Sequence, residues 1–565
     1  MILQWIRGTL ARLRAKLSLQ ALQSRMHRED FGRNAIFRPR PASELHVRLQ
    51  AEDHMRSRFA VGRYEGAEKV NPILQHQYEF FSEMLTTRIA LIALEDFLDF
   101  VLHQYDQSTA INQDTMNGRL SKAETERWQH VGPRFRRVAK YLAEKACSLQ
   151  STGTLRLHPS ETMDILDEVW IAAESCVEFA MLSEQTHGLF PDETHLEIYQ
   201  QGEQVYWEHG VKHAFRLEPD FALWRQHSKA IYGREPITYD FDWLNVRLGP
   251  GLVHDHGFDL RQAVTMLSWI IQGGLVEPGK LGIPFLLEDG VYNSLGEQLD
   301  LRPSAVRKAV SAFIVTKDAM DVEGRELYKP KQEYRLSRRG FLRMSHSLGP
   351  HIIYSKQMAT ECLYAFIEGF AFRNIPPEWN GTATKAASDK LSNELGDWFE
   401  GAGKDVLANE GIRGDVRFKK AIGKGSAKIE IPPDVGELDF LGVLPDGHGV
   451  VLGEFKMTFC GTEPRYFRDD LSKFTEGPKC YAAKFRKKIQ WVVDNFSDVV
   501  KALKSIGLLQ DNATPQVLLP IMFTYGPSVA KYLIEDFPCR MLTEFVVDLR
   551  RGGTWPYKTG VRTCL

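Results

Sequence analysis

The sequence predicts a multidomain protein in which the N-terminal two-thirds is mainly α-helical and the C-terminal third is an α/β domain with a central mixed sheet. The chain has 565 residues, too many for one hydrophobic core at roughly 100–200 residues per domain. Apolar residues recur every three or four positions through most of residues 70–230, which is the period of a helix. From residue 382 onward, helical segments alternate with short apolar segments that favour strands, as is typical of an α/β domain.

The composition restricts the class of protein further. Hydrophobic residues make up 43% of the chain and charged residues 25%, as in an ordinary globular protein. These fractions exclude a disordered chain, a fibre and a multi-span membrane protein. The 71 lysines and arginines nearly balance the 73 acidic residues, for a net charge of −2. A nucleic-acid partner would therefore have to be bound by a local basic patch.

The cysteine content and the lengths of the apolar runs indicate the cellular compartment of the protein. The seven cysteines contain no CxxC pair, and an odd, sparse set argues against a disulfide scaffold or a four-cysteine zinc site. The sequence contains no uninterrupted run of 18 or more apolar residues, so no transmembrane helix is predicted. The N-terminus also lacks the apolar block and cleavage site of a secretory signal. We therefore expect a cytoplasmic protein in a reducing environment.

Residues 1–40 are a basic amphipathic N-terminal segment, with eight arginines and one lysine against Glu29 and Asp30. Apolar residues at helical spacing place the basic residues on the opposite face; they are Ile2, Ile6, Leu10, Leu13 and Leu17. The favoured interpretation is a helix docked on the protein body with a solvated basic face. The alternative is a helix that lies on an anionic membrane surface or on nucleic acid.

The next two regions are helical. Residues 41–235 are predicted as a helical domain, and residues 236–380 as a helical region that contains a possible winged helix-turn-helix. In the latter, 294–314 has the pattern of two helices joined by a turn, and a hairpin-like segment follows at Tyr334–Leu342. Arg302, Arg307 and Lys308 would lie on or near the recognition helix, although many such folds bind proteins instead. Two prolines and an Asn-Gly pair within 374–381 mark a domain boundary.

The C-terminal region, residues 381–565, contains the candidate catalytic residues. A helix is predicted over 386–410, and a short strand over 428–431. Two apolar segments, 436–444 and 449–457, flank a Pro-Asp-Gly-His turn at 445–448, which is a hairpin signal. The two segments are therefore predicted to be paired strands.

Strand geometry brings acidic and basic side chains together in this hairpin. Residues two apart in a strand project to the same face, so Glu454 lies beside Lys456, and Glu437 lies beside Asp439. The hairpin can bring Asp439 close to Glu454. Two adjacent carboxylates repel each other unless a cation lies between them, and a site with oxygen ligands suits Mg²⁺ or Mn²⁺. Such an ion polarises a phosphate oxygen and activates water, and a neighbouring lysine can stabilise the charge that develops on the phosphate.

Asp439, the hairpin and Glu454-Phe455-Lys456 resemble the core of the PD-(D/E)XK nuclease superfamily, which has a restriction-endonuclease-like fold. The resemblance covers about 180 residues and implies a mixed sheet with the element order α-β-β-β-α-β. The helix that carries Glu400 precedes the three strands. The remaining elements would be a helix over 481–503, a strand over 517–525, a short helix over 528–536 and a final strand over 541–549. Leu438 stands before Asp439 where the older family pattern has a proline, a departure that many family members share.

The resemblance also implies roles for individual residues. Asp439 and Glu454 would be metal ligands, Lys456 the catalytic lysine, Glu400 an additional metal ligand and Glu437 an alternate acid. Four basic residues on the following helix would contact the nucleic-acid backbone or form a solvated face; they are Lys484, Arg486, Lys487 and Lys488.

The function implied is a Mg²⁺- or Mn²⁺-dependent deoxyribonuclease, an endonuclease rather than an exonuclease, that acts as a prokaryotic defence effector against foreign DNA. Its helical two-thirds would be a sensor or specificity region, with DNA, further copies of the chain and an activator protein as partners. The alternative is a non-catalytic DNA-binding or regulatory protein that uses the winged helix and keeps the nuclease fold as a scaffold.

Two other patterns are interpreted as structural. His254-Asp255-His256 has metal-like spacing but no third ligand in view, so we expect an ordinary loop. Cys460 has no paired histidine nearby in the sequence and is interpreted as a small thiol near the core. No GK[ST] phosphate loop occurs, so an ATPase motor is not predicted.

Overall fold

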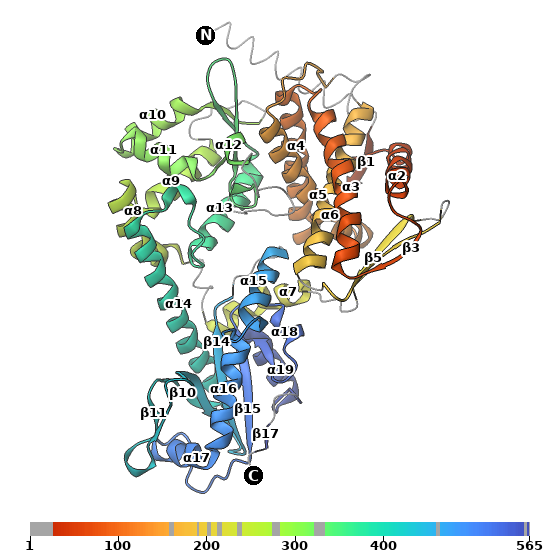
Figure 1. Cartoon of the computed structure of the whole chain (residues 1–565). Coiled ribbons are helices and arrows are strands. Elements are labelled where there is room, and N and C mark those ends of the chain that lie inside the picture. Colours follow the sequence, from red (N-terminus) through yellow and green to blue (C-terminus); the bar gives the residue numbers. More distant parts are fainter. Residues whose placement is uncertain are drawn as a thin grey trace. The chain divides into compact units, whose positions relative to one another are not determined.

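The computed structural model describes residues 26–157, 163–188, 191–200, 205–211, 217–233, 240–273, 283–320, 334–458, 464–558 and 562–563 (Figure 1). The chain forms two compact units. Unit 1 consists of Met1–Val211 and Leu244–Ser388, and unit 2 consists of Lys212–Trp243 and Asp389–Leu565. The expected helix within residues 1–25, and Cys460, lie outside the described residues. Across the part of the chain that is described, no helix combines the length and the apolar character needed to cross a membrane.

The first half of unit 1 is mainly helical, as predicted. Its long helices pack around an aromatic core in which the Phe135 ring lies 4.7 Å from the Trp170 ring. These helices are α2 (Pro41–Arg56), α3 (Ala67–Ile89), α4 (Leu94–Met116), α5 (Lys122–Leu149) and α6 (Met163–Gly188).

Short strands that the sequence did not predict also occur in this part of unit 1, within the basic N-terminal segment and within the helical domain. β1 (His27–Phe31) and β2 (Asn34–Arg38) form a hairpin, and β4 (Thr194–Ile198) is the central strand of a second small sheet, between β3 (Gly62–Glu65) and β5 (Trp207–Val211). Each strand has only four or five residues, too few for their alternation to stand out against long helices.

The basic residues next to the hairpin contact the body of unit 1. Arg40 Nε lies 2.6 Å from Asp167 Oδ2, and the Asp167 side chain is fully buried. Arg33 Nε lies 3.6 Å from Asp114 Oδ2. For this part of the N-terminal segment, the positive charges are therefore neutralised within the protein.

The second half of unit 1 contains the two helices predicted around residues 294–314. These are α10 (Glu288–Leu299) and α11 (Pro303–Ser311). A four-stranded sheet with the order β6-β9-β8-β7 accompanies them. Its strands are β6 (Phe285–Leu287), β7 (Ile314–Val315), β8 (Phe341–Met344) and β9 (His351–Ile353).

The hairpin in this region lies further along the chain than predicted. β8 and β9 form it, whereas residues 334–339 form turns, with the Arg338 and Arg339 amides donating to the Arg335 carbonyl. The Arg335 side chain is buried and pairs with Glu144 of α5. This tertiary ion pair holds a segment whose alternating polar and apolar residues resemble a strand.

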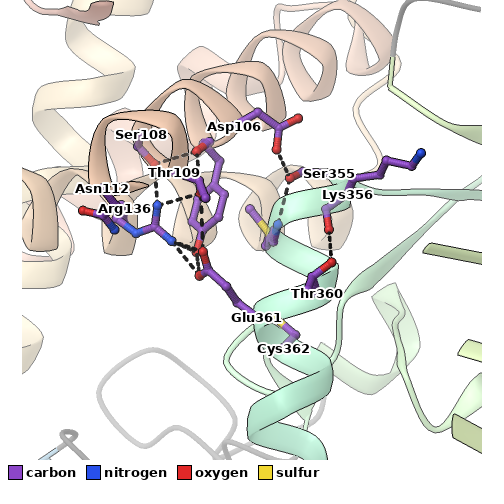
Figure 2. Close-up of polar contacts among 12 residues, drawn as sticks. Asp106, Ser108, Thr109, Asn112, Arg136, Ser355, Lys356, Thr360, Glu361 and Cys362 are labelled. Carbon is purple, nitrogen blue, oxygen red and sulfur yellow. Dashed lines mark hydrogen bonds and ion pairs between the residues drawn. The ribbon is translucent and has the colours of Figure 1, made fainter. Parts of the chain in front are cut away.

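A polar network joins α4 and α5 to α13 (Lys356–Phe370) within unit 1 (Figure 2). Arg136 of α5 donates to both carboxylate oxygens of Glu361 on α13. The same guanidinium donates to the hydroxyls of Ser108 and Thr109 on α4, at 2.9 and 2.8 Å. Segments more than 200 residues apart are thus joined by one half-buried guanidinium.

Unit 2 contains the predicted mixed sheet. Its main path has the order β10-β13-β14-β15-β16. β13 (Leu438–Val443) is antiparallel to β10 (Arg413–Phe418) and to β14 (Gly449–Lys456), whereas β14, β15 (Val517–Thr524) and β16 (Cys539–Met541) are parallel. The C-terminal α/β architecture is therefore present.

Four details of unit 2 differ from the predictions. The single helix predicted over 481–503 is divided into α16 (Tyr481–Asp494) and α17 (Phe496–Ser505). The first strand of the sheet is β10, whereas residues near 430 form β12 (Ile429–Glu430), which pairs with β11 (Ala421–Ile422) in a separate ribbon. The short helix is only α18 (Ala530–Leu533). Most of the predicted final strand is α19 (Leu542–Gly552). Its valines and phenylalanine favour strands, but Leu542, Phe545 and Val546 are buried at helical spacing, so packing of one helix face overrides local propensity.

Helices cover both faces of the sheet, and they identify the face on which each strand side chain lies. On one face, Leu441 and Leu452 pack in the same cluster as Phe485 and Ile489 of α16 (Tyr481–Asp494). On the other face, Phe455 contacts Phe399 of α14 (Thr382–Asn409), with ring centroids 5.2 Å apart. Because side chains alternate along a strand, Asp439 and Glu454 lie on the α16 face.

Candidate active site

The central hairpin brings the two predicted acids together. Phe440 of β13 lies opposite Gly453 of β14, so the next position along this register places Asp439 opposite Glu454. The turn at 445–448 is present, as predicted, with Gly447 at φ 72°. Both acids are almost completely buried, with 7% of Asp439 and 4% of Glu454 exposed. Buried carboxylates require compensating positive charge.

Two lysines supply that compensation. Lys456 Nζ lies 3.2 Å from Asp439 Oδ2 and 2.8 Å from Glu454 Oε1. Lys488 Nζ lies 3.2 Å from Asp439 Oδ1 and 2.5 Å from Glu454 Oε2. We call these four residues the charge cluster. It contains two negative and two positive side chains, so it is neutral as a whole.

The surroundings favour the ionised forms of Asp439 and Lys456. Burial opposes ionisation of Asp439, but Lys456, Lys488 and the Phe455 amide, which donates to Oδ2 at 3.0 Å, together lower the pKa of its carboxyl. Burial likewise disfavours the Lys456 ammonium, but Glu454 and Asp439 outweigh it and raise its pKa. Lys456 therefore holds its proton firmly.

Glu400 lies near the charge cluster but is bound to another partner. Its carboxylate accepts a 2.8 Å hydrogen bond from Arg417 Nε, and Arg417 also lies 3.1 Å from Asp397. Burial raises the pKa of Glu400, Arg417 lowers it, and the charges of Asp439 and Glu437 raise it further. Glu400 thus interacts electrostatically with Asp439 of the charge cluster and with Glu437.

Arg417 is a site residue that the sequence analysis missed. It adopts a left-handed backbone conformation with φ 63°, which is uncommon for a residue other than glycine. In β10, Val416 pairs with Phe440 and Phe418 pairs with Leu438, so this strained residue lies level with Asp439. Backbone strain of this kind tends to occur at functional sites. No local sequence signal marks it.

The basic residues of α16 do not form one surface. Lys484, Arg486 and Lys487 are exposed, and Arg486 is engaged by Asp536 at 2.8 and 3.0 Å. Lys488 is only 7% exposed and belongs to the charge cluster. A signal was present in the sequence: Lys488 lies three residues after Phe485 and seven after Tyr481, and therefore on the apolar face of the helix.

The His254-Asp255-His256 segment is the last turn of helix α8 (Phe241–His256), so the expectation of a loop was wrong. Asp255 Oδ2 accepts the Thr384 amide at 2.8 Å at the start of α14, and His254 Nδ1 lies 3.0 Å from Asp255 Oδ1. His256 Nε2 lies 2.8 Å from the Trp379 carbonyl oxygen. The segment thus holds the beginning of α14.

The charge cluster fits a divalent cation in its donor chemistry. Within the described ranges, no group of three or more His, Cys, Asp or Glu side chains is arranged to hold a metal. Asp439 Oδ1 and Glu454 Oε2 nevertheless converge on one cation, the Lys488 ammonium. Two carboxylate oxygens that share a positive charge are the ligands expected for Mg²⁺ or Mn²⁺ bound with additional waters.

Comparison of the chain with protein-family models, with curated proteins and with solved structures found no significant match.

Proposed function

We propose that unit 2 is a Mg²⁺- or Mn²⁺-dependent nuclease of the PD-(D/E)XK type, which hydrolyses phosphodiester bonds of DNA. The observation that carries this proposal is the buried pair Asp439 and Glu454 on adjacent strands. One oxygen of each acid contacts the Lys488 ammonium, and the other contacts the ammonium of the strand residue Lys456. An apolar α/β sheet gains nothing in stability from buried charges of this kind, because their desolvation offsets their attraction. Their presence is therefore better explained by chemistry.

Asp439 and Glu454 would hold the cation, with Glu400 and Glu437 as neighbouring acids. When bound, Mg²⁺ or Mn²⁺ would neutralise charge on the scissile phosphate and lower the pKa of a water molecule. Lys456 would donate a hydrogen bond to a phosphate oxygen as negative charge develops there. Its ammonium group lies over the Tyr481 ring, with Nζ 5.3 Å from the ring centroid, and its raised pKa keeps the donor protonated.

The family resemblance supports the remaining parts of the proposal. They are DNA rather than RNA as substrate, endonucleolytic cleavage, a cytoplasmic location, and a role in prokaryotic defence. Unit 1 would act as the sensor, specificity or oligomerisation region, through a partner protein or further copies of the chain.

Plasmid cleavage by the purified full chain tests the proposal. We expect EDTA-sensitive cleavage with Mg²⁺ or Mn²⁺, reduced at least about 100-fold by Glu454→Gln or Lys456→Met. Lys501→Met is the matched control, because Lys501 is exposed on the next helix, α17 (Phe496–Ser505), and pairs with Asp498 at 2.8 Å. It lies outside both the charge cluster and the basic residues expected to contact DNA. Full cleavage by the Glu454→Gln variant would refute the assignment.

The second candidate, DNA binding through a winged helix, is favoured by the topology of unit 1. The two helices α10 and α11 lie between β6 and the β8–β9 hairpin in sequence, and β9 pairs with both β6 and β8. Arg302 and Lys308 are exposed on or next to α11, whereas Arg307 pairs with Asp289 at 2.9 Å. If this surface binds DNA, Arg302→Ala with Lys308→Ala should weaken binding and reduce its salt dependence, measured by fluorescence anisotropy. Unchanged binding would exclude this candidate.

A further inference from the structure

Lys488 has an unusual position for a lysine on the surface helix of an α/β unit. Its side chain is 9% exposed, and its ammonium lies between Asp439 Oδ1 and Glu454 Oε2, at 3.2 and 2.5 Å. Lys456 already contacts the other oxygen of each acid. Every carboxylate oxygen of the pair therefore faces an ammonium group.

This arrangement has a consequence for any divalent ion. The charge cluster is neutral with both lysines in place, so it offers an incoming cation little net attraction. The oxygens that the ion needs are also those that Lys488 contacts. A divalent ion and the Lys488 ammonium cannot both lie between the same two oxygens, because like charges at such a distance repel strongly in a buried site.

We propose that Lys488 is a built-in counter-cation that occupies the cation position of the charge cluster and must move out before a divalent ion can bind. The proposal rests on the proposed function, since it takes Asp439 and Glu454 as the metal ligands. Lys488 is thus a positioning residue that stabilises the metal-free site and weakens its affinity for the metal.

The position of Lys488 on α16 lets its ammonium group move from the charge cluster into solvent. Lys484, one turn earlier, and Lys487, the preceding residue, are both exposed. The long, flexible lysine side chain can reach such neighbouring solvent by changing rotamers. Lys456, in contrast, extends from β14 and also donates to the Phe455 carbonyl at 3.0 Å. Of the two lysines, Lys488 is therefore the one that leaves.

Mn²⁺ binding to the full chain without DNA tests the proposal, measured by titration with detection of free Mn²⁺ by electron paramagnetic resonance. Lys488→Met removes the charge and keeps most of the apolar stem. We expect this variant to bind Mn²⁺ on the order of tenfold more tightly than the wild type. Lys484→Met should bind as the wild type does, and Glu454→Gln should lose the site. In metal-free buffer, Lys488→Met should melt at a lower temperature than the wild type, and Mn²⁺ should raise its melting temperature more.

The outcomes separate the two proposals. Equal Mn²⁺ affinity of the wild type and Lys488→Met, with loss in Glu454→Gln, would overturn the role of Lys488 and leave the metal site intact. Absence of Mn²⁺ binding by both folded proteins would overturn the metal site as well. If Lys488→Met does not fold without metal, Lys488→Gln replaces it in the same titration, and equal affinity again counts against the proposal.

Discussion

Replacing Asp439 by Asn should unbalance the charge cluster and destabilise the sheet of unit 2, and replacing Lys488 by Met in the same chain should restore part of that stability. Asparagine has nearly the shape of aspartate, so the perturbation is mainly the loss of one negative charge. The Asp439 carboxylate currently accepts hydrogen bonds from Lys456, Lys488 and the Phe455 amide. In the single variant, the half-buried Lys456 and the buried Lys488 share only Glu454.

The magnitude follows from the burial of the four groups. Removing one partner of a buried ion pair costs about 3–5 kcal/mol. We expect about 3 kcal/mol for Asp439→Asn, because Glu454 remains 2.8 Å from Lys456 and 2.5 Å from Lys488. Lys488→Met should cost a similar amount, since it leaves two carboxylates with one lysine. The double variant is neutral again, so its cost should fall short of the sum of the single costs by about 2 kcal/mol.

The assay is a urea titration of the full chain in metal-free buffer, monitored by hydrogen exchange of peptides from β13, β14 and α16. This measurement isolates the stability of the sheet from that of unit 1. Lys484→Met serves as the control on α16 and should show no coupling to Asp439→Asn. Additive costs in the double variant would refute the inferred interaction between Asp439 and Lys488.

Two further predictions concern α14, and each has an internal comparison. A Cβ at Gly403 would overlap the Phe455 ring, whereas a Cβ at Gly401 meets no atom within 4 Å. Gly403→Ala should therefore lower the free energy of unfolding by about 1–3 kcal/mol, and Gly401→Ala should raise it by about 0.5–1 kcal/mol. Equal effects of the two substitutions in urea denaturation would contradict this packing. Hydrogen bonds from the Thr384 amide and then from His254 lower the pKa of Asp255 to about 2, below the value of about 3.9 in an unfolded chain. The stabilisation by ionised Asp255 is therefore present above about pH 4 and is lost as the pH falls toward about 2. Asp255→Asn should accordingly lower the melting temperature at pH 6, and its difference from the wild type should shrink below pH 4; a difference independent of pH would contradict this role.

The sequence predicted much of the site because its signals are local. The turn at 445–448 fixes the pairing of β13 with β14, and the two-residue period of strands then places Asp439, Glu454 and Lys456 on one face. The predictions failed where the deciding contacts are distant in sequence. Residues 334–339 form turns because Arg335 pairs with Glu144 of α5.

The sequence by itself therefore determined the overall order of a helical part followed by an α/β part, and the central hairpin with its two acids and one lysine. Only the tertiary structure showed that α16 brings Lys488 to the same two carboxylates, and that the strained Arg417 binds Glu400 beside them. The physical reason is the separation along the chain over which each interaction acts. Turn chemistry and side-chain periodicity act within a few residues, whereas neutralisation of a buried charge depends on whichever group the packing of the sheet and its helices brings within hydrogen-bonding distance.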